Sequence, residues 1–250
     1  MLNYIHAECY KVTRRKYPYL FLLLVLLGEG LVLFSMWFTN VHGNHNSLEN
    51  AISILVLMLS IGLYAAIVVC DMVYSDQYRH NTLKNEVSFG LSRARIYFGK
   101  TLSAMITAIV LMAVLVGAYL GIAFLTLPNS DPEVTQVMLA TLGMGLLTAL
   151  PLWLGALAVT MALFSNVRSN VAAAFCAVGA IGLLPNAFKL MALLTNNELF
   201  VKLHDICLTA PLDYFDGTWA SCTNAWAVGM GWLAVSMIVG YLLFRRKEIN

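Results

Sequence analysis

The sequence predicts an all-α membrane protein with six transmembrane helices. Of its 250 residues, 60% are hydrophobic and 11% are charged, and the mean hydropathy is +0.77. Soluble domains carry about 25% charged residues, so this chain lacks the charge that a water-exposed surface needs. The apolar residues also gather in six stretches that each reach the roughly 20 residues needed to cross a bilayer. Inside lipid the backbone must satisfy its own hydrogen bonds, so each stretch is expected to be helical.

The six expected spans form a single transmembrane domain that covers residues 1–250. They lie at residues 17–38, 51–73, 101–127, 134–164, 171–194 and 225–244. The fourth is long for one crossing and contains Pro151. We interpret it as one kinked helix, because neighbouring helices can tolerate the backbone bond that a proline removes. Two short re-entrant segments are the alternative.

The distribution of basic residues predicts the orientation. With six spans, every lysine and arginine except Lys189 and Lys202 falls on one side of the membrane. Cytoplasmic loops carry an excess of Lys and Arg, so this side is expected to be cytoplasmic and to hold both termini. An odd number of spans would break the pattern. No small-residue cleavage site follows the first apolar stretch, which therefore is not expected to be a signal peptide.

Three segments outside the spans show patterns of their own. Residues 1–16 place Leu2, Ile5, Cys9 and Val12 at helical spacing among basic residues, which indicates an amphipathic helix at the inner membrane surface. Residues 74–100 form a long cytoplasmic loop, in which we expect a short helix over 81–89. Residues 195–224 are expected to cap the outer helix ends.

The predictions for the cytoplasmic loop rest on four residues. Leu83 and Val87 share a face of the short helix, Gly90 ends it, and Ser92 caps the next helix. In the outer cap, Cys207 and Cys222 lie on the same side and could pair, but two free thiols are the favoured interpretation.

Catalytic and metal-binding patterns are lacking in the sequence. Residues Phe98 to Thr101 match the end of a phosphate-binding P-loop, but Ala94 occupies a position where that motif needs glycine. We therefore expect no enzymatic activity, no resident metal and no nucleic-acid partner. Glycines at Gly117 and Gly121 have the spacing that typically marks close helix packing in membranes.

One charged residue lies within a span. Glu29, between two glycines in the first span, would cost about 2.5–3.5 kcal/mol at the centre of a bilayer on insertion scales. It is therefore a candidate for the translocation path of a substrate. The alternative interpretations are a protonated side chain and a structural ion pair, for which Lys189 is the candidate partner.

The loop before the third span resembles a known family. Its matching positions are Thr82, Leu83, Lys84, Asn85, Gly90, Ser92, Arg93 and Lys100. They resemble the cytoplasmic loop of type-2 ABC export permeases, although Asn81 stands where a glycine often precedes the threonine. The layout of the whole chain is similar to that family too: an amphipathic N-terminal helix, six spans, a loop helix and a structured outer segment.

The resemblance implies a membrane-spanning permease subunit of an ATP-driven transporter. Two copies of a separate ATP-binding subunit would hold ATP and magnesium, and a second permease copy or a sister permease would complete the complex. The N-terminal segment would be an elbow helix against membrane lipid, and the loop helix would be the coupling helix. Contacts to the ATPase would come from Thr82, Leu83, Lys84, Asn85, Glu86, Val87, Gly90 and Arg93.

In length and general character, the chain resembles the permeases of the lantibiotic or bacteriocin immunity and peptide-export group. That similarity implies export or expulsion of an amphipathic substrate, such as an antimicrobial peptide, from a bacterial plasma membrane. The alternative is a secondary transporter or channel that works without an ATPase. Such a protein would be expected to show more polar residues within its spans, or broken helices in two matching halves.

Overall fold

The computed structural model describes residues 1–43, 45–80, 82–88 and 90–247, and at 75–80, 82, 83 and 85 it describes the backbone only. Within these ranges every regular element is a helix, so the all-α prediction is confirmed. The elements are α1 (Leu2–Thr13), α2 (Lys16–Val41), α3 (Leu48–Met58), the 3₁₀ turn η1 (Leu59–Ile61), α4 (Gly62–His80), α5 (Thr82–Ser88), α6 (Arg93–Thr126), α7 (Pro132–Asn166), α8 (Asn170–Val178), the π turn η2 (Gly179–Leu183), α9 (Leu184–Thr195), α10 (Glu198–Asp205), α11 (Ala210–Asp213) and α12 (Trp219–Arg246).

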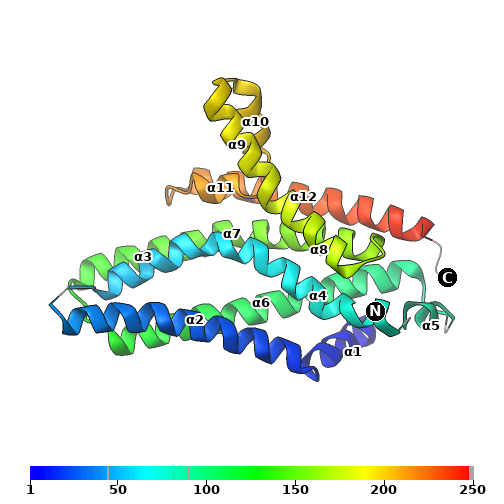
Figure 1. Cartoon of the computed structure of the whole chain (residues 1–250), viewed down its shortest axis with the longest axis horizontal. Coiled ribbons are helices and arrows are strands. Elements are labelled where there is room, and N and C mark those ends of the chain that lie inside the picture. The colour runs from blue at the N-terminus through cyan, green and yellow to red at the C-terminus, as the bar shows by residue number, and fades with distance from the viewer. Residues whose placement is uncertain (44, 81, 89, 248–250) are drawn as a thin grey trace.

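The long helices run side by side along the longest axis of the molecule (Figure 1). Helix α7 is the most buried of them and contacts α3, α4, α8 and α12, whereas α2 packs mainly on α6. The N-terminus, α5 and the end of α12 lie at one end of the bundle, and α9 and α10 extend away from it (Figure 1). Among the described residues, five continuous segments can cross a membrane by length and composition, and α3 with α4 forms a sixth if that bent pair counts as one span.

The second expected span is not straight. Its two halves, α3 and α4, meet at an angle of 58° across the turn η1. The indole Nε1 of Trp153, from α7, donates a hydrogen bond of 2.9 Å to the Leu59 carbonyl in that turn. Gly62 leaves room for this ring, because a Cβ there would lie 2.4 Å from the same Nε1. The Gly62 N–H also donates to this carbonyl, so Trp153 adds a contact from another helix to the turn, and the sequence of the span alone does not predict it.

The fourth span is a single helix, so its division into two re-entrant segments is wrong. Pro151 lies inside α7 and has no N–H to give to the carbonyl of Leu147 four residues before it. That carbonyl instead accepts a hydrogen bond of 3.1 Å from Nε1 of Trp226 on α12. Because the neighbouring helix supplies the missing donor, α7 continues through the proline.

The closest helix contact joins α7 to α12. A Cβ on Gly229 would lie 2.5 Å from the backbone carbonyl of Pro151, and one on Gly155 would lie 2.8 Å from the carbonyl oxygen of Gly229. By contrast, a Cβ on Gly117 or Gly121 would meet nothing within 4 Å. The expected close approach at the spaced glycines of the third span is therefore wrong within this chain.

The segment after α9 contains α10 and α11, and its cysteines are unpaired. Cys207 and Cys222 are both buried and both free, so the favoured interpretation of two free thiols is confirmed. Nε1 of Trp232 on α12 donates a hydrogen bond of 2.8 Å to the carbonyl of Ile206, at the end of α10. This bond holds the segment against the last span.

The two glycines of α12 provide a matched test of this packing. Gly229→Ala is expected to destabilise the protein by about 1–3 kcal/mol, because the added methyl group would overlap the backbone of α7 and no side-chain rotation can relieve that. Gly231→Ala has open space around its Cβ and should leave stability unchanged or slightly raised. Thermal unfolding of the detergent-solubilised protein measures both. Equal melting temperatures for the two variants would contradict the predicted contact.

Candidate functional site: the junction of α1, α5 and α6

Helix α5 is held outside the spans by a defined turn. Gly90 adopts a positive φ of 83°, a conformation that glycine enters without strain. Around it the N–H of Gly90 donates to the Val87 carbonyl and the N–H of Leu91 donates to the Glu86 carbonyl. The Ser92 hydroxyl then accepts a hydrogen bond from the N–H of Arg95 and caps α6. The expectations for Gly90 and Ser92 are thereby confirmed.

A buried lysine lies where these helices meet. Lys100, in the second turn of α6, is 1% exposed. Its Nζ lies 2.7 Å from Oε2 of Glu8 on α1 and 3.5 Å from Oε1 of Glu86 on α5. One ammonium group therefore links three helices that are distant in the sequence. Removing an ammonium from water costs several kcal/mol unless it is well paired, so these two carboxylates are required partners.

Two further residues of α1 complete the charge cluster. Lys11 donates to Glu8 Oε1 and lies 3.6 Å from Glu86 Oε1. The hydroxyl of Tyr4 donates a hydrogen bond of 3.0 Å to Glu86 Oε2. Each carboxylate thus contacts both ammonium groups. We call Tyr4, Glu8, Lys11, Glu86 and Lys100 the junction cluster.

Gly99 is what allows Tyr4 to reach this position. A Cβ on Gly99 would lie 2.5 Å from Cδ1 of Tyr4, so the ring rests directly on the backbone of α6. The same ring lies 5.7 Å from Nζ of Lys100, within the range of a cation–π contact. The Gly99-Lys100 pair that looked like the end of a phosphate loop therefore serves the contact between α1 and α6.

The charges of the cluster support one another. Burial acts to raise the pKa of Glu8, but the ammonium groups of Lys100 and Lys11 outweigh it, so the pKa of Glu8 is lowered. Burial, together with the carboxylates of Glu8 and Glu86, raises the pKa of Tyr4 well above its usual value. At neutral pH the cluster consequently contains charged Glu8 and a Tyr4 hydroxyl that donates rather than ionises.

The amphipathic pattern of α1 indicates only part of its packing. Of the apolar residues Leu2, Ile5, Cys9 and Val12, which are expected at the membrane surface, Val12 is buried and Leu2 is exposed. Glu8, a polar position of the same pattern, is 3% exposed. Helix α1 is thus oriented by its charged contact with Lys100 as well as by its apolar residues.

The residues expected to contact an ATPase have different surroundings. Lys84 is exposed on α5, whereas Val87 packs against the buried cluster of Ile96, Tyr97 and Phe244. The side chains of Thr82, Leu83 and Asn85 lie outside the described residues, as do Asn81 and Phe89. Glu86 belongs to the junction cluster, and Gly90 forms the turn after α5.

Arg93 contacts the end of the last span. Its Nη1 donates to the backbone carbonyl of Arg245 and, at 2.8 Å, to that of Lys247. The Arg245 carbonyl belongs to the final turn of α12 and Lys247 is its C-cap, a place where a cation is stabilised by the helix dipole. The structure therefore places Arg93 at a contact between α6 and the C-terminal segment of the chain.

Glu29 lies apart from the junction cluster, in the first span. Its proposed partner Lys189 instead donates a hydrogen bond of 2.8 Å to Asp213. The structural pairing of Glu29 with Lys189 is therefore wrong. Oε2 of Glu29 is buried and has no hydrogen-bond partner among the described residues.

Comparison with known families identifies the chain. The profile of the family described as "ABC-2 family transporter protein" matches residues 4–186, which run from α1 into α9. The chain belongs to this ABC-2 transporter family. No curated protein matches it at a significant level. Membership identifies a multi-pass membrane subunit, distinct from the ATPase, and it implies an ABC ATPase as partner.

The junction cluster of this ABC-2 protein was only half visible in its sequence. Lys100 belongs to the loop pattern that carries the resemblance and Glu86 lies within that loop, but the amphipathic pattern of residues 1–16 assigns no partner to Glu8. The available signal was an acidic residue in a basic N-terminal segment, together with a lysine at the entry of an apolar stretch. Two such residues, 92 positions apart, are not paired by any local rule.

A double-mutant cycle tests the buried pair. Lys100→Met is expected to destabilise the protein by about 3–5 kcal/mol, because Glu8 and Glu86 would remain buried without their shared cation. Adding Glu8→Gln to Lys100→Met should cost less than the sum of the single changes. The control is Lys202→Met, which removes a surface pair of 3.9 Å with Glu198 and should have no measurable effect. Equal thermal stability of Lys100→Met and Lys202→Met would exclude the predicted role.

The lowered pKa of Glu8 predicts how stability depends on pH. A carboxylate with a lowered folded-state pKa stabilises the fold above its unfolded value of about 4.3, and this contribution is lost as the pH falls through the folded value. The difference in melting temperature between wild type and Glu8→Gln should therefore be full at pH 7 and shrink below about pH 4. A difference that stays constant into acid would mean that ionised Glu8 does not contribute.

Proposed function

We propose that this chain is the permease subunit of an ABC transporter that exports or expels an amphipathic substrate, such as an antimicrobial peptide. ATP would be hydrolysed by two copies of a separate ATP-binding subunit. A second copy of this chain, or a sister permease, would complete the membrane part. The family match supports the permease assignment. The segments expected outside the membrane contain seven acidic residues against Lys189 and Lys202, and this negative charge is compatible with a cationic peptide.

The observation that carries the proposal is the attachment of α5. This short helix lies outside the spans at the end that holds α1 and the last turn of α12 (Figure 1), and Glu86 ties it to α1 and to α6. A helix in that place can receive force from a soluble partner. The buried contacts of Glu86 and Val87 would then pass its displacement to α6 and the end of α12, as a rigid-body movement.

The proposed orientation places α5 in the cytoplasm. The end with α1 and α5 contains Arg14, Arg15, Lys84, Arg93 and Arg95, whereas α10 carries Lys202. By the positive-inside rule the first end faces the cytoplasm, where a soluble ATPase has access to α5. The same reasoning puts both termini inside the cell.

Charge reversal on α5 tests the ATPase contact. Lys84→Glu changes an exposed side chain, so it should leave the melting temperature unchanged while co-purification of the ATPase and ATP-driven transport are both lost. The matched control is Lys202→Glu, also an exposed lysine on a short helix, which should retain both. Val87→Asp is unsuitable for this purpose, because it would place a charge against the chain's own apolar cluster.

A second variant separates binding from coupling. Glu86→Gln loosens α5 from Tyr4, Lys11 and Lys100 but keeps Lys84 in place. The ATPase should still co-purify and hydrolyse ATP, while transport per ATP falls. If Lys84→Glu retains the ATPase and transports normally, α5 is not the coupling helix. Full transport by Glu86→Gln would show that the junction cluster does not transmit the movement.

A further inference from the structure

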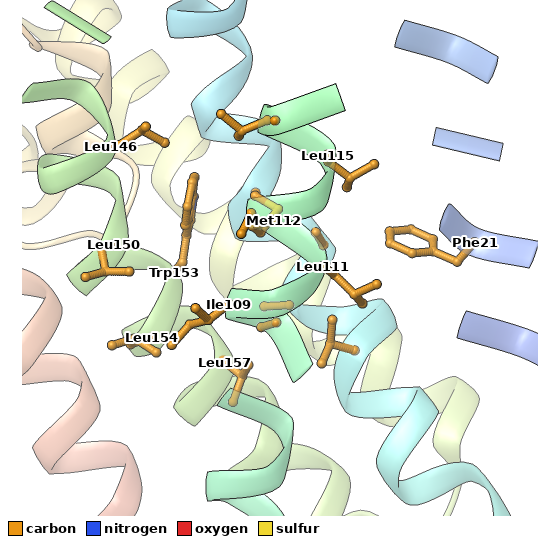
Figure 2. Close-up of a pocket in the computed structure, with 18 residues that line it drawn as sticks. Phe21, Ile109, Leu111, Met112, Leu115, Leu146, Leu150, Trp153, Leu154 and Leu157 are labelled. Carbon is orange, nitrogen blue, oxygen red and sulfur yellow. The ribbon is translucent and has the colours of Figure 1, made fainter. Parts of the chain in front are cut away.

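A cavity of about 570 Å³ lies between α2, the bend that joins α3 to α4, and α6. Its walls are almost entirely apolar, formed by side chains such as Phe21, Val25, Leu55 and Met112. A second cavity of about 360 Å³ lies between α4, α6 and α7 and shares Phe21 and Met112 with the first. Figure 2 shows Phe21 facing α6 from one side and Trp153 facing it from α7. Together they form an apolar space beside the first span.

Glu29 is the one charged residue among the described residues that line the larger cavity. Its Oε2 is buried without a hydrogen-bond partner. The neighbouring hydroxyl of Tyr119 donates its hydrogen to the Ala51 carbonyl at 3.0 Å, and Lys189 is engaged with Asp213. A charged group within a span is costly and normally faces a cavity or a partner. Here it faces a cavity.

The glycines beside Glu29 do not serve helix packing. A Cβ on Gly28 or on Gly30 would meet nothing within 4 Å. Gly28 belongs to the lining of the larger cavity, and Gly30 does not. At Gly28 the missing side chain therefore leaves open space next to the carboxylate rather than a contact between helices.

The cavity lies at the boundary between protein and lipid. Helix α2, which forms one wall, is the least buried of the membrane-crossing helices in the described part of the chain. Its outer face exposes Leu24, Leu27 and Leu31, whereas its main contact is with α6. A ligand that partitions into the bilayer would meet this wall first.

We propose that this cavity binds a lipophilic monocation. The cationic centre would pair with the Glu29 carboxylate, and the apolar body would fill the space between Phe21 and Met112. The volume lies within the roughly 300–1,000 Å³ typical of small-ligand sites, which are mostly apolar with a few polar groups that fix orientation. A neutral acyl chain would leave the buried Oε2 of Glu29 unpaired, and an anion would be repelled by it. Binding of the cation is independent of the proposed transport function. Only the statement that such cations are a substrate class rests on that function.

Tetraphenylphosphonium and tetraphenylborate test the site, because they have nearly the same shape and opposite charge. Binding of each to the full chain in lipid nanodiscs is measured by equilibrium dialysis, after subtraction of binding to empty nanodiscs, without ATP or ATPase. We expect saturable binding of the phosphonium only. Glu29→Gln should weaken it by at least about tenfold, since a desolvated charge pair is lost. Glu198→Gln, an exposed carboxylate on α10, should bind as wild type does.

Two glycine variants locate the ligand. Gly28→Leu places a side chain in the cavity and should abolish phosphonium binding, whereas Gly30→Leu also has free space but does not line the cavity and should retain it. Equal melting temperatures show that both variants fold. Three results would each overturn the proposal. They are phosphonium binding that is unaffected by Glu29→Gln, equal binding of the borate, and no binding above that of empty nanodiscs because acyl chains fill the space. None of these results depends on the ATPase, so they are independent of the coupling test.

Discussion

The buried ammonium of Lys100 constrains how α1, α5 and α6 pack, at the end of this ABC-2 protein that we propose to face the cytoplasm. At 1% exposure it has no access to bulk water, and the carboxylates of Glu8 and Glu86, together with the ring of Tyr4, compensate for that loss. If either α1 or α5 moved away, its carboxylate would no longer compensate the buried ammonium of Lys100. Helices α1 and α5 are therefore obliged to stay on α6, although α1 buries few large apolar side chains of its own. The energetic penalty for separation, rather than the strength of each bond, makes the three helices one unit.

A second constraint, the need of backbone carbonyls for hydrogen-bond partners, bears on the irregular parts of the bundle and of the segment after α9. Three tryptophans act in the same way at three irregular positions. Trp153 donates to the Leu59 carbonyl in the turn that bends the second span. Trp226 donates to the Leu147 carbonyl, because the residue that would normally donate to it is Pro151, which has no N–H. Trp232 donates to the Ile206 carbonyl at the end of α10. Indole carries one donor within a large apolar body, so it can deliver a hydrogen bond between helices without burying an unpaired group.

The contrast between predicted and unpredicted features follows from the range of the forces involved. Gly90 and Ser92 act on their own turns, so their residue types alone indicated where α5 ends and α6 begins. The inward face of α1, the tryptophan contact at Leu59 and the close contact at Gly229 each depend on a residue at least 70 positions away. The glycine spacing at Gly117 predicted packing that the chain does not make, because spacing shows that a close approach is permitted but not which helix fills it.

Helix α6 connects the junction cluster to the cavity beside Glu29. It begins next to α5, carries Lys100 in its second turn and continues without a break through Met112, which lines both cavities. At 1.5 Å per residue these two positions lie about 18 Å apart along the helix axis. Helices α7 and α12 are locked together by backbone contact at Gly229, whereas α2 on the other side of the cavity is held mainly by α6. A displacement of α6 at the junction would therefore change the cavity beside Glu29, because α6 and α2 both line it, whereas α7 and α12 do not.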